Sequence, residues 1–124
     1  MILKSDEKYI YILEDDEGIR EVLELLLESE SYQVQTFATI EGFRKRDLLI
    51  IPDLFLFDVM LPDGSGIDLC DEIRVANIHH EVPIVIMSAH ASLNDLKGKC
   101  HAESFIEKPF DINVLLEKIR VAIG

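Results

Sequence analysis

The sequence has few basic residues. Its 12 lysines and arginines stand against 24 aspartates and glutamates, which gives a formal net charge of −12 at pH 7. A surface this acidic repels phosphate backbones and anionic lipids, so we expect the chain to bind neither nucleic acid nor a membrane directly. The excess of acid suits a divalent cation or a basic partner surface, although a solvated acidic face alone would give the same balance.

The chain also lacks the segments that mark membrane and exported proteins. The apolar run from Leu48 to Pro52 is far below the roughly 20 residues that a membrane-spanning helix needs. The first residues lack the pattern of a signal peptide, so we expect a cytoplasmic protein. Its two cysteines, Cys70 and Cys100, have no CxxC spacing, which favours free thiols over a disulfide or a metal pair.

No linker, low-complexity tract or internal repeat interrupts the 124 residues. This length suffices for one domain with a substantial core and is too short for two. The composition, 48% hydrophobic and 29% charged, is that of an ordinary globular protein. We therefore expect a single domain over residues 1–124.

Along the chain, β-branched and aromatic runs alternate with segments of helical periodicity. The predicted strands are Lys8–Leu13, Tyr32–Phe37, Asp53–Phe57, Pro83–Met87 and Glu103–Glu107. The predicted helices are Asp16–Glu30, Thr39–Arg46 with Thr39 as N-cap, one that begins at Ser65 or Gly66, Ser92–Lys99, and a last one capped by Asp111. Five strands that alternate with five helices imply right-handed crossovers, and so predict a doubly wound α/β fold around a five-stranded parallel sheet.

The central predicted strand ends in a carboxylate. Four apolar residues, Leu54–Phe57, lead directly to Asp58, and a Pro/Gly-rich loop, Pro62–Gly66, follows. A short apolar run bounded by turn residues is typical of a strand that is buried on both faces. Asp58 would then lie where open α/β sheets bind their ligands, although an aspartate here could also simply cap the turn.

Other strand ends carry reactive side chains as well. Asp15 and Asp16 follow the first strand, Ser88 follows the fourth and Lys108 follows the fifth. Taken alone, the two aspartates could cap a helix, and a lone lysine before a proline is commonly a surface residue. In a parallel sheet, however, all these ends face one edge, so we expect them to share a pocket with Asp58.

Three crowded carboxylates repel one another unless a cation neutralises them, which predicts a bound Mg²⁺ or a similar ion such as Mn²⁺. Beside such an ion, Asp58 can act as a nucleophile and form an acyl phosphate. Lys108 would neutralise charge on the transferred group, and Ser88 would hydrogen-bond a phosphoryl oxygen.

Four motifs together resemble the receiver domain of bacterial two-component response regulators, over essentially the whole chain. They are Leu13-Glu14-Asp15-Asp16, Asp58 to Gly66, Met87-Ser88-Ala89 and Phe105 to Phe110. The resemblance implies the flavodoxin-like strand order 2-1-3-4-5. It also implies a domain that catalyses its own phosphorylation and dephosphorylation rather than an ordinary enzyme.

The resemblance gives the site residues their roles. Asp58 would accept a phosphoryl group from a histidine kinase or a phosphotransfer protein, and Lys108 would assist it. The metal would be held by Asp15, Asp16, Asp58 and the backbone carbonyl of Met60.

By the same resemblance, Ser88 and Phe105 are the switch pair, and the Lys108–Pro109 peptide bond is cis. Their movement would change the surface formed by the fourth helix, fifth strand and fifth helix, which would act on an output domain or partner, or form a homodimer.

One position departs from the family pattern, and one is variable within it. His101-Ala102 stands where the family usually has Gly-Ala, and the apolar Met60 occupies a variable position beside the pocket, where it could shield an acyl phosphate from water. Met60 also argues against a dehalogenase-like phosphatase, which needs a second aspartate there. The remaining alternative is a pseudo-receiver that binds partners without being phosphorylated. The pair His79-His80 has no other ligands nearby that would make it a metal site.

Overall fold

The computed structural model describes residues 7–89 and 100–124. Five strands form one parallel sheet in the order β2-β1-β3-β6-β7. Their bounds are Tyr9–Leu13 for β1, Gln33–Phe37 for β2, Leu54–Asp58 for β3, Ile84–Ser88 for β6 and Ser104–Glu107 for β7. If only the five strands of this sheet are numbered along the chain, the order is 2-1-3-4-5, as predicted. The predicted doubly wound fold is confirmed.

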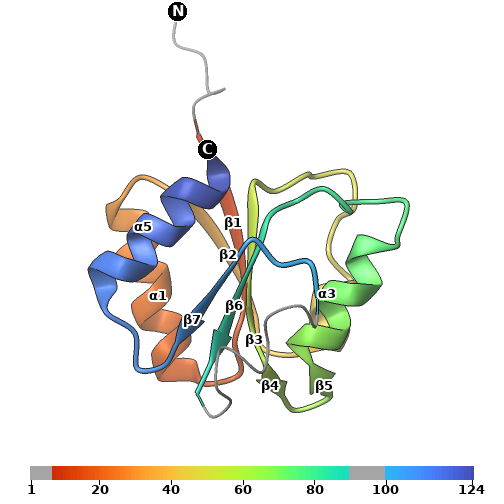
Figure 1. The fold of residues 1–124 in the computed structure, drawn as a ribbon, viewed down its shortest axis with the longest axis horizontal. Coiled ribbons are helices and arrows are strands. Elements are labelled where there is room, and N and C mark those ends of the chain that lie inside the picture. Colours follow the sequence, from red (N-terminus) through yellow and green to blue (C-terminus); the bar gives the residue numbers. More distant parts are fainter. Residues whose placement is uncertain (1–6, 90–99) are drawn as a thin grey trace, which may run out of the picture.

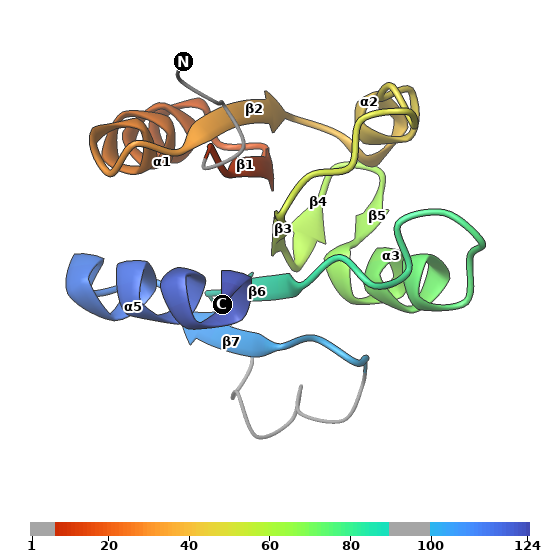
Figure 2. The ribbon, with the colours of Figure 1, turned by 90° about the horizontal axis from the view of Figure 1, so that it is seen from above.

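Helices cover both faces of the sheet (Figures 1 and 2). The described helices are α1 (Glu17–Ser29), α2 (Ile40–Arg44), α3 (Gly66–Arg74) and α5 (Ile112–Ile123). α1 and α5 lie on one face, whereas α2 and α3 lie on the other. The helix predicted over Ser92–Lys99 falls outside the described residues. None of the described helices is long and apolar enough to cross a membrane.

Side-chain caps fix where the helices begin. Asp16 accepts a hydrogen bond from the Ile19 amide at the start of α1, and Ser65 accepts one from the Ile67 amide at the start of α3. Thr39 and Asp111 are the N-caps of α2 and α5, as predicted from the sequence.

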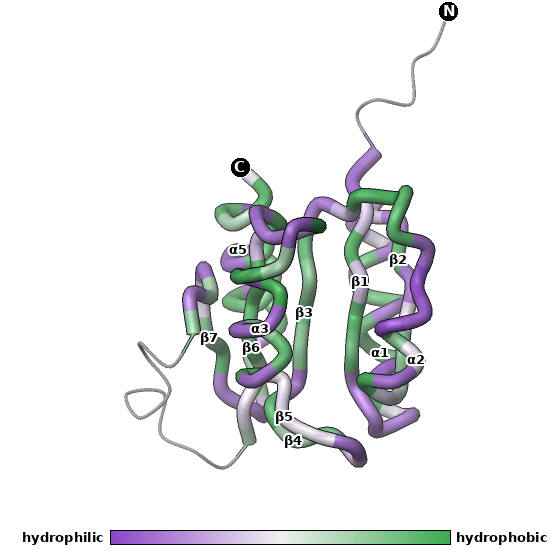
Figure 3. Tube along the Cα trace, turned by 90° about the vertical axis from the view of Figure 1, so that its right-hand side faces the viewer, coloured by the Kyte–Doolittle hydropathy of each residue, from purple (hydrophilic) through white to green (hydrophobic). Residues whose placement is uncertain are grey.

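The core consists of two apolar layers, one on each side of the sheet. Every residue of β3 and β6 is buried, and Figure 3 shows most of β3 as hydrophobic. On the α2–α3 side, Phe43 packs edge-on against Phe55 and Phe57. On the α1–α5 side, Leu23 and Leu27 of α1 and Leu115 and Ile119 of α5 are fully buried. A sheet buried in this way holds its strand ends in fixed positions.

Several strand boundaries differ from the prediction by one residue. β3 begins after Asp53, whose carboxylate Oδ2 accepts a hydrogen bond from the Tyr9 amide at 2.8 Å. At their other ends, β3 and β6 extend one residue further than predicted, to Asp58 and Ser88. Both site residues therefore belong to the sheet itself. The sequence also gave no indication of a small antiparallel hairpin, β4 (Met60–Leu61) and β5 (Gly64–Ser65), between β3 and α3.

Candidate functional site

A cavity of about 800 Å³ opens at the carboxyl ends of the central strands. Its walls are formed by residues at or just after the carboxyl ends of β1, β3, β6 and β7, together with Ile19 of α1. The lining residues are Glu14, Asp15, Asp16, Ile19, Asp58, Val59, Met60, Ser88, Ala89, Lys108, Pro109 and Phe110. Every predicted site residue except Phe105 is among them.

Three carboxylates converge in this cavity. One oxygen from each of Glu14, Asp15 and Asp58 lies within 4.8 Å of the other two. Glu14 and Asp58 are 1% and 7% exposed, whereas Asp15 is open to solvent. This is the only such group of potential metal ligands in the parts of the chain that the structure describes.

Asp16 does not join the cluster, although the sequence predicted it as a ligand beside Asp15. Its Oδ1 accepts a hydrogen bond from the Ile19 amide at 2.9 Å, so this carboxylate caps α1. Glu14 takes the place in the acidic group instead, because it directly follows the buried strand β1. The signal that could have separated them was the capping position itself, since Asp16 directly precedes a helical pattern.

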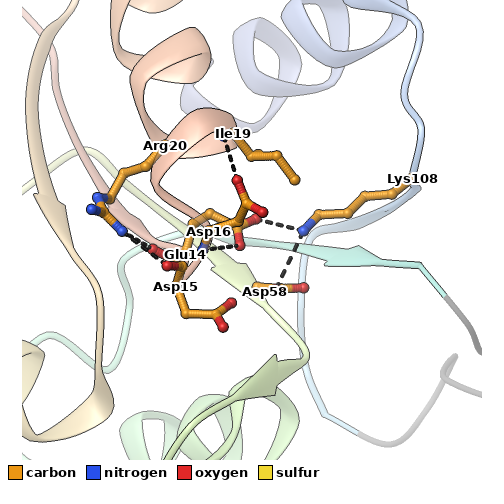
Figure 4. Close-up of polar contacts among 7 residues, drawn as sticks. All are labelled: Glu14, Asp15, Asp16, Ile19, Arg20, Asp58 and Lys108. Atoms are coloured by element: carbon orange, nitrogen blue, oxygen red, sulfur yellow. Dashed lines mark hydrogen bonds and ion pairs between the residues drawn. The ribbon is translucent and has the colours of Figure 1, made fainter.

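Lys108 contacts two of the three carboxylates (Figure 4). Its Nζ lies 2.5 Å from Glu14 Oε1 and 3.3 Å from Asp58 Oδ2. Burial alone would lower the pKa of Lys108, but the hydrogen bond to Glu14 and the charge of Asp58 outweigh it and raise that pKa. Lys108 is therefore a cation at neutral pH, and the Lys108–Pro109 bond after it is cis, as predicted.

Glu14 is held by two contacts. Lys108 binds Oε1, and the Asp16 amide donates a hydrogen bond to Oε2 at 3.1 Å. Burial raises the pKa of Glu14, whereas the hydrogen bonds from Lys108 and Asp16 act in the opposite direction. The strongly charged partner at 2.5 Å explains how an acid this deeply buried is accommodated.

The predicted switch residues lie on neighbouring strands. Ser88 ends β6, is 2% exposed and accepts a hydrogen bond at its backbone carbonyl from the Lys108 amide at 2.8 Å. Phe105 lies in β7, where it pairs with Ile86 of β6. It is half-buried and packs against the core on the α2–α3 side. Met60 is 64% exposed at the rim of the cavity.

The loop after Asp58 folds tightly back onto the strand. The Gly66 amide donates a hydrogen bond to the Val59 carbonyl at 2.9 Å. A Cβ at position 66 would lie 2.1 Å from the backbone carbonyl oxygen of Asp58, so only glycine fits there. The start of α3 is thereby fixed against the backbone of Asp58.

The same loop also holds α2, which the sequence did not indicate. The carboxylate of Asp63 accepts hydrogen bonds from the amides of Ile40 and Glu41, each at 2.9 Å. These bonds lower the pKa of Asp63. The turn that follows the site is thus fastened to the start of a second helix.

The donor set fits a hard divalent cation. Mg²⁺ prefers oxygen ligands and commonly uses one or two carboxylates. The three carboxylates and Lys108 together carry a formal charge of −2 when all are ionised, which a divalent ion would neutralise.

The remaining candidates serve the fold. His79 is 7% exposed, and its Nδ1 accepts a hydrogen bond from Arg46 Nη2 at 3.1 Å, away from the acidic cluster. Cys70 and Cys100 are buried free thiols. Burial raises the pKa values of both thiols, which disfavours the nucleophilic thiolate form.

Comparison with known proteins agrees with the motifs. The family model for the response regulator receiver domain matches residues 10–120. The chain is 34% identical to the transcriptional regulatory protein CseB of Streptomyces coelicolor over 125 residues, which cover 96% of this chain and 50% of that protein. It spans about half the length of the curated relatives that it matches.

Solved structures share the fold. A putative response regulator from Chloroflexus aurantiacus superposes with a TM-score of 0.87 at 25% identity, covering 95% of this chain and 98% of that one. The beryllofluoride-activated receiver domain dimer of NtrC4 gives a TM-score of 0.82 at 26% identity, with 93% and 95% of the two chains covered.

Proposed function

We propose that this chain, which belongs to the response regulator receiver domain family, is a Mg²⁺-dependent phosphorylation switch with Asp58 as its phosphoacceptor. The observation that carries the proposal is the position of the Asp58 carboxylate. It is buried at the end of the central strand, 3.3 Å from Lys108 and next to the carboxylates of Glu14 and Asp15.

In the proposed reaction, a carboxylate oxygen of Asp58 attacks the phosphorus of a phosphohistidine. The P–O bond forms, the P–N bond breaks, and the electron pair leaves with the imidazole, which takes a proton. Glu14, Asp15, Asp58 and the Met60 carbonyl would hold Mg²⁺. When bound, the ion would neutralise charge on the transferred phosphoryl group. Lys108 would meet the phosphoryl oxygens with a fixed positive charge, and Ser88 would donate a hydrogen bond to one of them.

The switch would act through Ser88 and Phe105. If the Ser88 hydroxyl moves toward the phosphoryl group, it leaves room for the ring of Phe105 to turn inward from its half-buried position on β7. The surface that responds would include β7, α5 and the predicted helix before β7. Phosphate then acts as a ligand that shifts the protein between two states.

The proposed partners follow from this role. A sensor histidine kinase or phosphotransfer protein would supply the phosphoryl group in the cytoplasm. The responding surface would bind an output domain or partner protein, or a second copy of the chain, as the dimeric NtrC4 receiver domain suggests.

The test is the intact mass after incubation with acetyl phosphate and Mg²⁺, for the wild type and Asp58→Asn. We expect the wild type to gain one phosphoryl group only when Mg²⁺ is present, and the variant to gain none. No gain in the wild type would favour a pseudo-receiver that binds partners without being phosphorylated.

A further inference from the structure

Residues Glu14–Asp16 connect β1 to α1, and we call them the acidic loop. A second cation, Arg20, binds this loop from the side opposite Lys108 (Figure 4). Arg20 lies in the first turn of α1 and is half-buried. Its Nη1 donates hydrogen bonds to two successive backbone carbonyls, that of Glu14 at 2.9 Å and that of Asp15 at 3.2 Å. Lys108 therefore binds carboxylates, whereas Arg20 binds the backbone that carries them.

Asp15 is the member of the acidic group that needs such support. Glu14 is fixed through both carboxylate oxygens, and Asp58 is part of β3 and contacts Lys108. The Asp15 carboxylate is exposed, and among residues 7–89 and 100–124 no side chain or amide holds it. Its position is thus set by its own backbone, and Arg20 binds that backbone at the carbonyls of Glu14 and Asp15.

Arg20 is itself well anchored. Its amide donates a hydrogen bond to the Asp16 carbonyl at 2.9 Å, and the Asp16 side chain caps the same turn through the Ile19 amide. The guanidinium, the cap and the helix therefore form one unit with the acidic loop. A planar guanidinium suits this task because one nitrogen can serve two neighbouring acceptors in a fixed orientation.

We propose that Arg20 is a positioning residue of the cation site, which holds the Asp15 carboxylate in place for Mg²⁺ by fixing the Glu14–Asp15 backbone. This inference rests on the proposed function, because it assumes that the acidic group binds Mg²⁺. It assigns to Arg20 an effect on metal affinity that a purely stabilising residue would not have.

Positioning and charge predict opposite results. A cation near a metal site repels the metal, so if Arg20 acted only through its charge, its removal would tighten Mg²⁺ binding. If Arg20 positions Asp15, its removal loosens the ligand and weakens binding. Residues that orient metal ligands typically change metal affinity by about 10- to 100-fold when mutated.

The experiment is calorimetric titration of the unphosphorylated protein with Mg²⁺, for the wild type, Arg20→Met and Arg20→Lys. We expect Arg20→Met to bind about tenfold more weakly. Arg20→Lys keeps the charge but loses the guanidinium geometry, so its affinity should fall between the two. As a matched control, Arg120→Met removes an equal charge from an exposed pair with Glu117 on α5 and should bind as the wild type does.

A metal-free measurement separates positioning from loss of folding. Without Mg²⁺, the Asp16 amide, which donates to Glu14 Oε2, should exchange its hydrogen faster in Arg20→Met, while amides of β3 exchange as in the wild type. Unchanged or tighter Mg²⁺ binding by Arg20→Met, or wild-type affinity in Arg20→Lys, would overturn the positioning role of Arg20. Neither result would contradict the proposed function. No Mg²⁺ binding by the wild type would overturn the proposed function with it.

Discussion

The two ends of the sheet use their charged residues in different ways. At the carboxyl end, the carboxylates of Glu14, Asp15 and Asp58 face one cavity, and Lys108 balances only part of their charge. Crowded like charges of this kind are typical of functional sites, and a divalent cation would neutralise them.

At the amino end, Arg74 is hydrogen-bonded to four neighbouring groups. Its guanidinium donates hydrogen bonds to the carbonyls of His80, Val82 and His101 and to the carboxylate of Glu103, with distances of 2.7–3.0 Å. The difference indicates that charge at the amino end maintains the fold, whereas charge at the carboxyl end is available for chemistry. Four predictions test this contrast, and they differ in the size of the expected effect.

The largest effect is expected for Gly66→Ala. The new methyl group would meet the Asp58 carbonyl oxygen at 2.1 Å, so the backbone must shift. We expect a loss of unfolding free energy of about 4 kcal/mol, measured by urea denaturation, together with impaired phosphorylation. Gly18→Ala is the matched control in α1, where the nearest atom would be 3.4 Å away, and it should leave the protein at least as stable. Equal stabilities of the two variants would contradict the close approach.

Arg74→Met should destabilise the protein without affecting the chemistry. Replacement removes this donor from three backbone carbonyls and leaves Glu103 Oε1 with the Ile84 amide, so we expect a loss of about 2–3 kcal/mol in unfolding free energy. At a temperature where the variant is folded, phosphorylation by acetyl phosphate should stay within about twofold of the wild-type rate, since Arg74 lies at the far end. Arg44→Met, which removes only an exposed pair with Glu72, should cost about 0.5 kcal/mol. A large loss of phosphorylation in folded Arg74→Met would show that the two ends are not separate.

Asp15→Asn and Asp16→Asn should differ in Mg²⁺ affinity. The first removes a carboxylate from the acidic group, and we expect binding to weaken about tenfold or more. The second keeps a capping side chain on α1 outside that group, so its affinity should change by less than about threefold. Calorimetric titration with Mg²⁺ measures both affinities, and the reverse order would support Asp16 as the ligand, as predicted from the sequence.

The smallest effect concerns pH at the amino end. Burial and the neighbouring Arg46 cation lower the pKa of His79 below its ordinary value of 6.5. A histidine with a lowered folded-state pKa stabilises the protein fully above pH 6.5, and this contribution is lost as the pH falls below that value. We expect the stability advantage of the wild type over His79→Asn to shrink between pH 7 and pH 5. An advantage that stays constant over this range would contradict the lowered pKa of His79.

The fold could be predicted because hydrophobic runs and helical periodicity are strong signals in this chain. β3 and β6 are buried over all their residues, which the runs Leu54–Phe57 and Ile84–Met87 indicated. The family resemblance supplied the strand order. The hairpin β4–β5 was missed because strands of two residues have no periodicity to detect.

The predicted site residues other than Phe105 all line the cavity, but the prediction paired Asp15 with Asp16, whereas the structure groups Asp15 with Glu14. Three acids follow β1 in succession, and composition alone does not show which two face inward. The choice depends on where β1 ends and where α1 is capped, and single-residue boundaries are weakly encoded in sequence. The contacts of Asp63 with the amides of Ile40 and Glu41 depend on tertiary structure and could not be predicted from spacing. Those of Arg20 with the carbonyls of Glu14 and Asp15 depend on how the chain turns between β1 and α1, which the sequence pattern did not indicate.

The central claim is that Asp58 itself carries the phosphoryl group, and chemical trapping tests it most directly. Borohydride reduces an aspartyl phosphate to homoserine, so the protein would be incubated with acetyl phosphate and Mg²⁺, reduced, digested and sequenced by mass spectrometry. We predict homoserine at position 58 alone, and none when Mg²⁺ is omitted. Homoserine at position 15 or 16, or none at position 58 although the intact protein gains a phosphoryl group, would contradict the account.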